Sequence, residues 1–191
     1  MNFRSKNFYR KLIYPGYDYK KISINPAEIK KLCAQKACGL IKRRLWLSES
    51  DKELINNELM DVNISKMPNV REIIKKLKSE CSCTLGIIQK VVNIFFKHLY
   101  TFADDLGLSD NDFSECDCPL DTYILKKIYA DCNAKKIPQS LITKSGKINV
   151  GNTVVTWSQL DDFGVYEKIQ GYVDKLKTDS RLGYDFDNWK S

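Results

Sequence analysis

The sequence predicts a mainly α-helical fold: a single helical domain of about six to seven helices, with a small β-hairpin or meander near residues 139–156. Two observations support this. Apolar residues recur at spacings of three and four through most of the chain after residue 24. Helix-capping residues or proline stand before most of these runs. The composition, 43% hydrophobic and 29% charged over 191 residues, is that of a globular chain with one core.

The first half of the predicted domain contains three helices. Asn25, Pro26 and Glu28 form a helix start, and the helical spacing continues to about Trp46. Ser50 with Glu53 forms a capping box that predicts a second, shorter helix. Pro68 opens the third.

The most apolar helix is predicted to follow a cap at Thr84 and to end at Gly107, and we expect it to be the centre of the fold. An acidic loop over 104–117 leads to a helix begun by Pro119. Gly151-Asn152, between short alternating runs, predicts the hairpin. Ser158 with Asp161 caps a last amphipathic helix to about Leu176, before an aromatic tail.

Positive charge is concentrated at the start of the chain. The net charge is +7, and residues 1–24 carry six cations against Asp18 alone, so they contribute +5 of it. Six aromatic residues are interleaved with these cations, a mixture suited to phosphate attraction and base stacking. The alternative is a basic arm whose aromatics pack on the core. The predicted DNA-binding cations of this arm are Arg4, Lys6, Arg10, Lys11, Lys20 and Lys21.

Several classes of protein are disfavoured by the sequence. No apolar stretch is long enough to cross a bilayer, so no membrane partner is expected. The N-terminus lacks the apolar run of a secretory signal, so we expect a cytoplasmic protein whose seven cysteines are thiols. Walker, dinucleotide-binding, zinc-protease and nucleophile-elbow motifs are missing.

The cysteines offer one alternative site. Cys81 with Cys83, and Cys116 with Cys118, form two close pairs that would make a four-thiolate zinc site if they converged. Structural zinc sites prefer two to four residues between paired ligands, whereas each pair here has one, so structural thiols are the default expectation. His98 is the only histidine and is expected to pack in the central helix.

The most specific pattern is Gly86-Ile-Ile-Gln89-Lys90-Val-Val-Asn93 followed by Cys118-Pro-Leu-Asp121-Thr-Tyr-Ile124. Residues 81–129 resemble the helix-hairpin-helix DNA glycosylase superfamily, and the interval between motifs is closest to that of the archaeal 8-oxoguanine DNA glycosylases. The family hairpin reads Leu-Pro-Gly-x-Gly, whereas this chain has Cys83-Thr-Leu-Gly86 with one glycine and no proline. The resemblance implies a glycosylase-like core over 81–134, with Lys90 as the nucleophile and Asp121 as the catalytic carboxylate.

This resemblance agrees with the chemistry of the residues. Apolar surroundings from Ile87, Val91 and Ile94 would favour the neutral, nucleophilic form of the Lys90 amine. An acid in the first turn of a helix could accept a proton or stabilise a cationic sugar. The scheme requires no cofactor. We expect DNA contacts from Gly86, Gln89, Asn93 and Lys97, and candidate walls for an extruded base in Trp46, Tyr100, Trp157 and Trp189.

The alternative is a non-catalytic helical module that binds nucleic acid or a protein partner. Its contact surface would be the arm over 1–24 together with Lys75, Lys76 and Lys78. In both hypotheses residues 25–191 form one helical domain.

Overall fold

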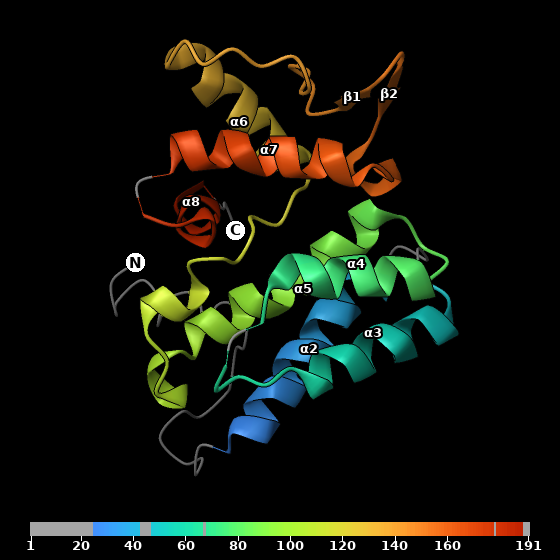
Figure 1. Cartoon of the computed structure of the whole chain (residues 1–191), viewed down its shortest axis with the longest axis vertical. Helices are drawn as coiled ribbons and strands as arrows, with labels where there is room; N and C mark the ends of the chain where they lie inside the picture. The colour runs from blue at the N-terminus through green and yellow to red at the C-terminus, as the bar shows by residue number, and fades with distance from the viewer. Residues whose placement is uncertain (1–24, 43–46, 67, 178, 189–191) are drawn as a thin grey trace.

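The computed structural model describes residues 25–42, 47–66, 68–177 and 179–188, and it confirms the mainly α-helical fold with one small hairpin (Figure 1). The described part contains seven α-helices and a two-stranded antiparallel sheet. The α-helices are α2 (Pro26–Lys42), α3 (Glu49–Asp61), α4 (Val70–Glu80), α5 (Leu85–Thr101), α6 (Thr122–Ala134), α7 (Phe163–Leu176) and α8 (Arg181–Asn188). The strands are β1 (Ile148–Val150) and β2 (Thr153–Val155), and the 3-10 turns are η1 (Asp104–Leu106), η2 (Asp110–Phe113) and η3 (Trp157–Gln159).

Side-chain caps set several helix starts at residues other than those predicted. Ser48, not Ser50, caps α3 by accepting a hydrogen bond from the Asp51 amide. Asn69 caps α4 and Asp162 caps α7 in the same way. Each of these side chains satisfies an amide that a helix start leaves unpaired.

Three further boundaries differ from the prediction. Helix α5 ends at Thr101, and Gly107, with φ of +68°, closes the short turn η1. Helix α6 begins at Thr122, so Asp121 is its cap and not a residue of its first turn. The aromatic tail contains a helix, α8, which buries Tyr184 and Phe186.

Helix α5 is the central element, as predicted. Helices α2 and α4 and the turn η3 pack against it, and Figure 1 shows α6, α7, α8 and the hairpin gathered at one end of the molecule. Of the 17 residues of α5, all of them described by the structure, Lys90 is the only one that is not buried. The central helix therefore offers solvent one side chain, and it is a lysine.

The hairpin pairs Ile148 with Val155 and Val150 with Thr153 across a two-residue turn. Gly151, the first turn residue, has φ of +58°, the conformation that a tight hairpin turn requires there. A second turn precedes β1, in which the Gly146 amide donates to the Thr143 carbonyl. No helix of the described residues is both long and apolar enough to span a membrane.

Gly86 lies where α5 meets η3. Its amide donates to the Leu160 carbonyl at 2.8 Å. A Cβ placed on it would lie 1.8 Å from the Trp157 carbonyl oxygen, which is backbone and has little room to move. This close approach explains why glycine is needed here.

We predict that Gly86→Ala destabilises the protein by about 1–3 kcal/mol, because the added methyl overpacks the α5–η3 contact. Gly171→Ala is the matched control: Gly171 lies within α7, and a Cβ added to it would meet no neighbouring side chain or element within 4 Å, so alanine should be neutral or stabilise by up to about 1 kcal/mol. Urea denaturation of both variants measures the difference. Equal stabilities would contradict the packing described.

Candidate functional site

Lys90 of α5 and Asp121, the cap of α6, are 31 residues apart in the chain and contact each other directly. Lys90 Nζ lies 2.8 Å from Asp121 Oδ2 and 3.5 Å from the Pro119 carbonyl oxygen. The Lys90 side chain is 15% exposed and that of Asp121 is 30% exposed. The structure thus brings the two residues of the family-like motifs together as a partly buried ion pair that solvent can reach.

Asp121 is held in place by its second carboxylate oxygen. Asp121 Oδ1 accepts a hydrogen bond from the Ile124 amide at 2.9 Å, which caps α6. Oδ2 is left to face Lys90. The same carboxylate therefore caps α6 and binds Lys90.

Two buried glutamines hold the irregular segment 117–121 that leads into this cap. The Gln89 side chain of α5 donates to the Leu120 carbonyl at 3.0 Å and accepts from the Leu120 amide at 3.1 Å. The Gln170 side chain of α7 does the same for Cys118, at 2.8 and 3.1 Å. These amide side chains replace the backbone partners that an irregular buried segment lacks.

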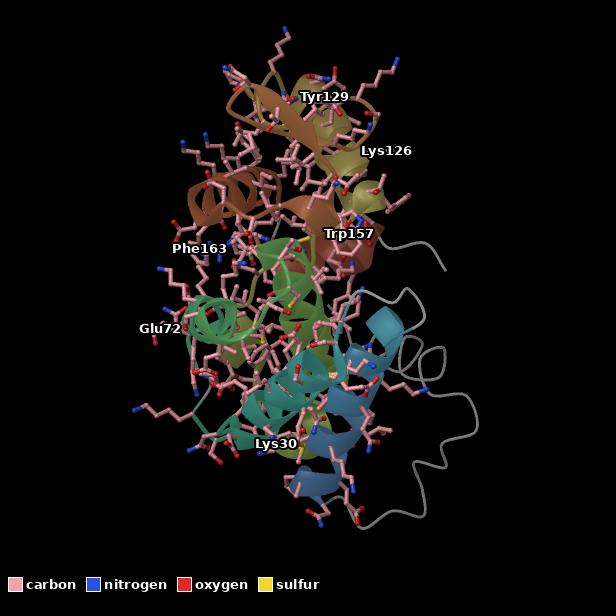
Figure 2. All side chains as sticks on the ribbon, turned by 90° about the vertical axis from the view of Figure 1, so that its right-hand side faces the viewer. Lys30, Glu72, Lys126, Tyr129, Trp157 and Phe163 are labelled. Atoms are coloured by element: carbon pink, nitrogen blue, oxygen red, sulfur yellow. The ribbon has the colours of Figure 1, made fainter. Side chains whose placement is uncertain are left out.

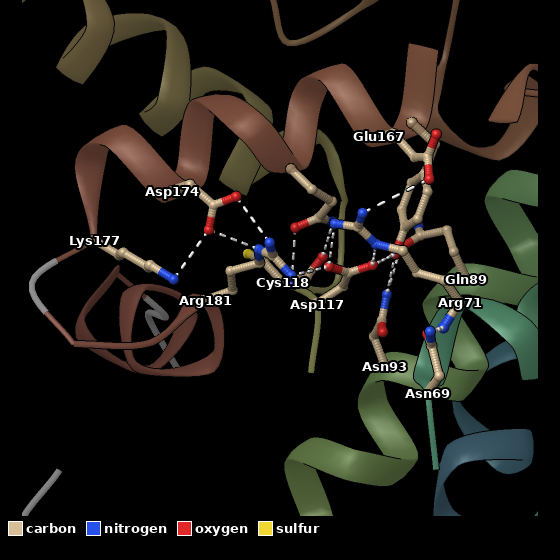
Figure 3. Close-up of polar contacts among 12 residues, drawn as sticks. Asn69, Arg71, Gln89, Asn93, Asp117, Cys118, Glu167, Asp174, Lys177 and Arg181 are labelled. Atoms are coloured by element: carbon tan, nitrogen blue, oxygen red, sulfur yellow. Dashed lines mark hydrogen bonds and ion pairs between the residues drawn. The ribbon is translucent and has the colours of Figure 1, made fainter. Parts of the chain in front are cut away.

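Asp117, at the start of this segment, is fully buried and binds cations from two other helices (Figure 3). Arg71 of α4 donates to both carboxylate oxygens, at 2.9 and 3.0 Å. Arg181 of α8 donates to Oδ1 and the Tyr166 hydroxyl of α7 donates to Oδ2, both at 2.8 Å. We call Asp117, Arg71, Arg181 and Tyr166 the Asp117 cluster. It was not predicted from the sequence, because no local pattern links residues so far apart.

The charge state of Asp121 follows from its surroundings. Burial raises the pKa of its carboxyl, but the charge and hydrogen bond of Lys90, with the Ile124 and Tyr123 amides, outweigh burial and leave this pKa below its ordinary value. Asp121 is therefore ionised at neutral pH. A carboxylate of lowered pKa stabilises a positive charge well and accepts a proton poorly.

Four residues predicted to contact DNA have internal roles instead. Gly86 lies beneath η3, and Gln89 binds Leu120. Asn93 is fully buried and donates to the Tyr166 hydroxyl at 3.0 Å. Lys97, 5% exposed, forms an ion pair with Asp185 and lies over the Phe186 ring. The polar side of α5 faces protein because the segment 117–121 and α8 cover it.

The predicted walls of a base pocket have mixed outcomes. Tyr100 packs against Phe113 and Phe186, and ten residues of helix place it about 15 Å from Lys90 along the axis, so it is not a wall of this site. Trp157 is nearer, because it contacts Gly86 one turn before Lys90, although it is only 9% exposed. Trp46, Trp189 and the arm over 1–24 lie outside the described residues.

Two cavities lie elsewhere on the described surface. One of about 400 Å³ lies between α2 and α3 and is lined in part by Cys38 and Glu53. The other, of about 210 Å³, lies between Lys75, Lys78 and Phe163. Lys90 and Asp121 line neither of them.

The cysteine pairs do not converge on a metal site. No group of three or more His, Cys, Asp or Glu side chains among the described residues is placed to hold a metal ion. Cys81 and Cys83 lie near Asp51, and burial raises their pKa to about 11 and about 12. Burial also raises the pKa of Cys116 and Cys118, which lie near Asp117 and Asp185 respectively. All four thiols are therefore protonated at neutral pH.

His98 is a buried residue of the central helix. It is 4% exposed, and burial, with the charges of Lys97 and Lys36, lowers its pKa to about 3. The imidazole of this α5 residue is therefore neutral and is packed against protein, as expected.

No protein-family model matches the chain, and no curated protein or solved structure matches it. A function for the chain must therefore be inferred from the geometry of the described residues.

We predict that Asp117→Asn lowers the free energy of unfolding by about 3–5 kcal/mol, since it removes the charge that the partly buried Arg71 and Arg181 share. The control is Asp174→Asn. Asp174 also binds Arg181 but is 34% exposed, so its loss should cost about 1 kcal/mol or less. Guanidinium denaturation measures both. Similar losses in the two variants would contradict the role given to Asp117.

We also predict a pH-dependent effect of Asp121→Asn, which keeps an oxygen for the α6 cap but loses the charge that faces Lys90. At pH 7 the variant should be less stable by about 1–2 kcal/mol. Because the folded-state pKa of Asp121 is lowered, the wild-type advantage is full above about pH 4 and is lost as pH falls through the folded-state value. Thermal unfolding from pH 7 to pH 3 tests this, and a difference that grows on acidification would contradict it.

Proposed function

We propose that the protein is a DNA N-glycosylase, with an associated lyase activity at abasic sites, in which Lys90 is the nucleophile. The observation that supports the proposal is the 2.8 Å contact between Lys90 Nζ and Asp121 Oδ2. These are the two positions that the motif resemblance pairs as nucleophile and carboxylate. Their contact depends on the tertiary fold, because 31 residues separate them.

The exposure of Lys90 also supports this role. It is the one residue of α5 that is not buried, while its aliphatic neighbours Ile87 and Ile94 are covered. A nucleophile must be accessible to its substrate, and this amine is the accessible polar group of an otherwise covered helix. An ordinary surface lysine would have no such surroundings.

The reaction follows from the two groups without a cofactor. The ion-paired ammonium first releases a proton to water, and the neutral Lys90 amine then attacks C1′ of the target nucleotide. The C1′–N bond to the base breaks, and the departing base takes the proton that the amine loses on forming its new bond. The C1′–O4′ bond then breaks as O4′ takes a proton from water, which leaves a protonated Schiff base on Lys90. Loss of a C2′ proton to water breaks the C3′–O3′ bond, so the 3′ phosphate departs and the strand is cut.

Asp121 acts in this scheme as a fixed negative charge. Its lowered pKa keeps it ionised, so it stabilises the positive charge that develops on the sugar as the base departs. Its bond to the Ile124 amide fixes that charge in place before substrate arrives. The Asp121→Asn variant should therefore slow the reaction while leaving Lys90 in place.

We predict that the wild-type protein forms a covalent adduct with DNA when borohydride is present, on oligonucleotides that carry 8-oxoguanine, uracil or an abasic site. Lys90→Arg should abolish the adduct, because a guanidinium forms no reducible imine with the sugar. Arginine preserves the positive charge beside Asp121, so circular dichroism and DNA binding of this variant should match the wild type.

Two results would overturn the proposal. One is the absence of an adduct, and of base release, with wild-type protein on every substrate. The other is an adduct of undiminished yield in Lys90→Arg. In the first case the non-catalytic binding module becomes the preferred function. In the second case another amine forms the adduct, so Lys90 is not the nucleophile. In both cases the Lys90–Asp121 pair is a structural ion pair at a helix cap.

A further inference from the structure

A second concentration of positive charge lies in the described part of the chain, around α6 and the turn before the hairpin. Residues 122–147 contain six lysines and one acid, Asp131. Lys127 pairs with Asp131, and Lys135 donates to the Leu176 carbonyl. Three of the remaining lysines, namely Lys126, Lys144 and Lys147, are exposed and form no ion pair with described residues. We call these three the lysine patch.

The lysine patch adjoins the Lys90–Asp121 pair through Gly146. A Cβ placed on Gly146 would lie 2.5 Å from the Thr122 carbonyl oxygen and 2.9 Å from Lys126 Cγ. Thr122 directly follows Asp121 in the chain, so the turn that carries Lys144 and Lys147 packs on the start of α6. Figure 2 shows Lys126 at the end of the molecule that is remote from Lys30 of α2.

The turn has a defined shape that fixes these lysines relative to α6. The Gly146 amide donates to the Thr143 carbonyl, and the Thr143 amide donates to the Lys147 carbonyl, both at 2.9 Å. Gly146 has φ of +75°, which allows its close approach to α6. The backbone that carries the patch is thus ordered before any ligand binds.

We propose that the lysine patch binds the phosphates of the DNA strand on one side of the nucleotide that reacts with Lys90. This inference rests on the proposed function, which places a sugar at Lys90 and hence a phosphate on each side of it. Uncompensated lysines on an ordered backbone attract phosphates without reading sequence. The patch would set the position of the strand, and the Lys90–Asp121 pair would supply the chemistry.

The test is the salt dependence of binding to duplex DNA that carries a tetrahydrofuran abasic analogue, which lacks the reactive C1′ hydroxyl. Lys144→Gln with Lys147→Gln should reduce the slope of log Kd against log salt by about 1.8, since each phosphate contact contributes about 0.9. Binding should weaken several-fold at about 0.1 M salt. The reduction should be the same on two unrelated sequences, because phosphates and not bases are contacted.

The matched control replaces two exposed lysines outside the patch, Lys31→Gln in α2 with Lys66→Gln between α3 and α4, which removes the same charge. Its slope should equal that of the wild type. Equal slopes for the two double variants, or a reduction confined to one sequence, would overturn the inference. Because this DNA is unreactive, the salt slope is measured independently of borohydride trapping. If the wild type forms adducts but the Lys144/Lys147 double variant keeps the wild-type slope, only the phosphate-binding role of the patch is rejected. If the slope is reduced but no adduct forms, only the glycosylase activity is rejected.

Discussion

The buried carboxylate of Asp117 is the interaction on which the arrangement of the site depends. It is fully covered by protein and receives hydrogen bonds from Arg71, Arg181 and Tyr166. A buried charge is tolerable only when it is paired and fully hydrogen-bonded, so α4, α7 and α8 must come together around it. Asp117 lies four residues before Asp121, and this convergence therefore fixes the path of the chain into the α6 cap.

The segment 117–121 connects the buried Asp117 cluster to the partly exposed Lys90–Asp121 pair. Gln89 and Gln170 bind the backbone between the Asp117 cluster and α6, so the segment is ordered although it forms no helix or strand. Its last residue, Asp121, then reaches the one side chain of α5 that is not buried. Polar contacts become progressively more exposed along this route, from a carboxylate closed to water to an ion pair that a ligand can approach. The lysine patch continues it onto the surface.

Much of the fold could be predicted from the sequence because each helix buries an apolar face of regular spacing. The boundaries were less predictable, since a cap depends on which nearby oxygen reaches the first free amides, as Ser48 does where Ser50 was expected. The burial of the polar side of α5 could not be predicted for a related reason. Asn93 and Lys97 follow helical spacing as solvated residues would, but their partners, Tyr166 and Asp185, lie far along the chain.

The candidate site is partly accessible to sequence reasoning. Short motifs select Lys90 and Asp121, and the structure joins them. The excess of lysine over residues 122–147 is visible in the sequence, but it is obscured when residues 25–191 are counted together, because their net charge is only +2. Only the fold shows that residues 122–147 gather their charge on α6 and one adjoining turn. The Asp117 cluster leaves no local signal at all.

The proposed mechanism requires that Lys90 is the amine that forms the covalent bond with DNA. This is tested most directly by tandem mass spectrometry of the adduct reduced on abasic-site DNA, which identifies the modified residue. We expect a sugar-derived mass on the peptide that contains Lys90 and on no other. A modification on the N-terminal amine or on any other lysine, with Lys90 unmodified, would contradict the mechanism.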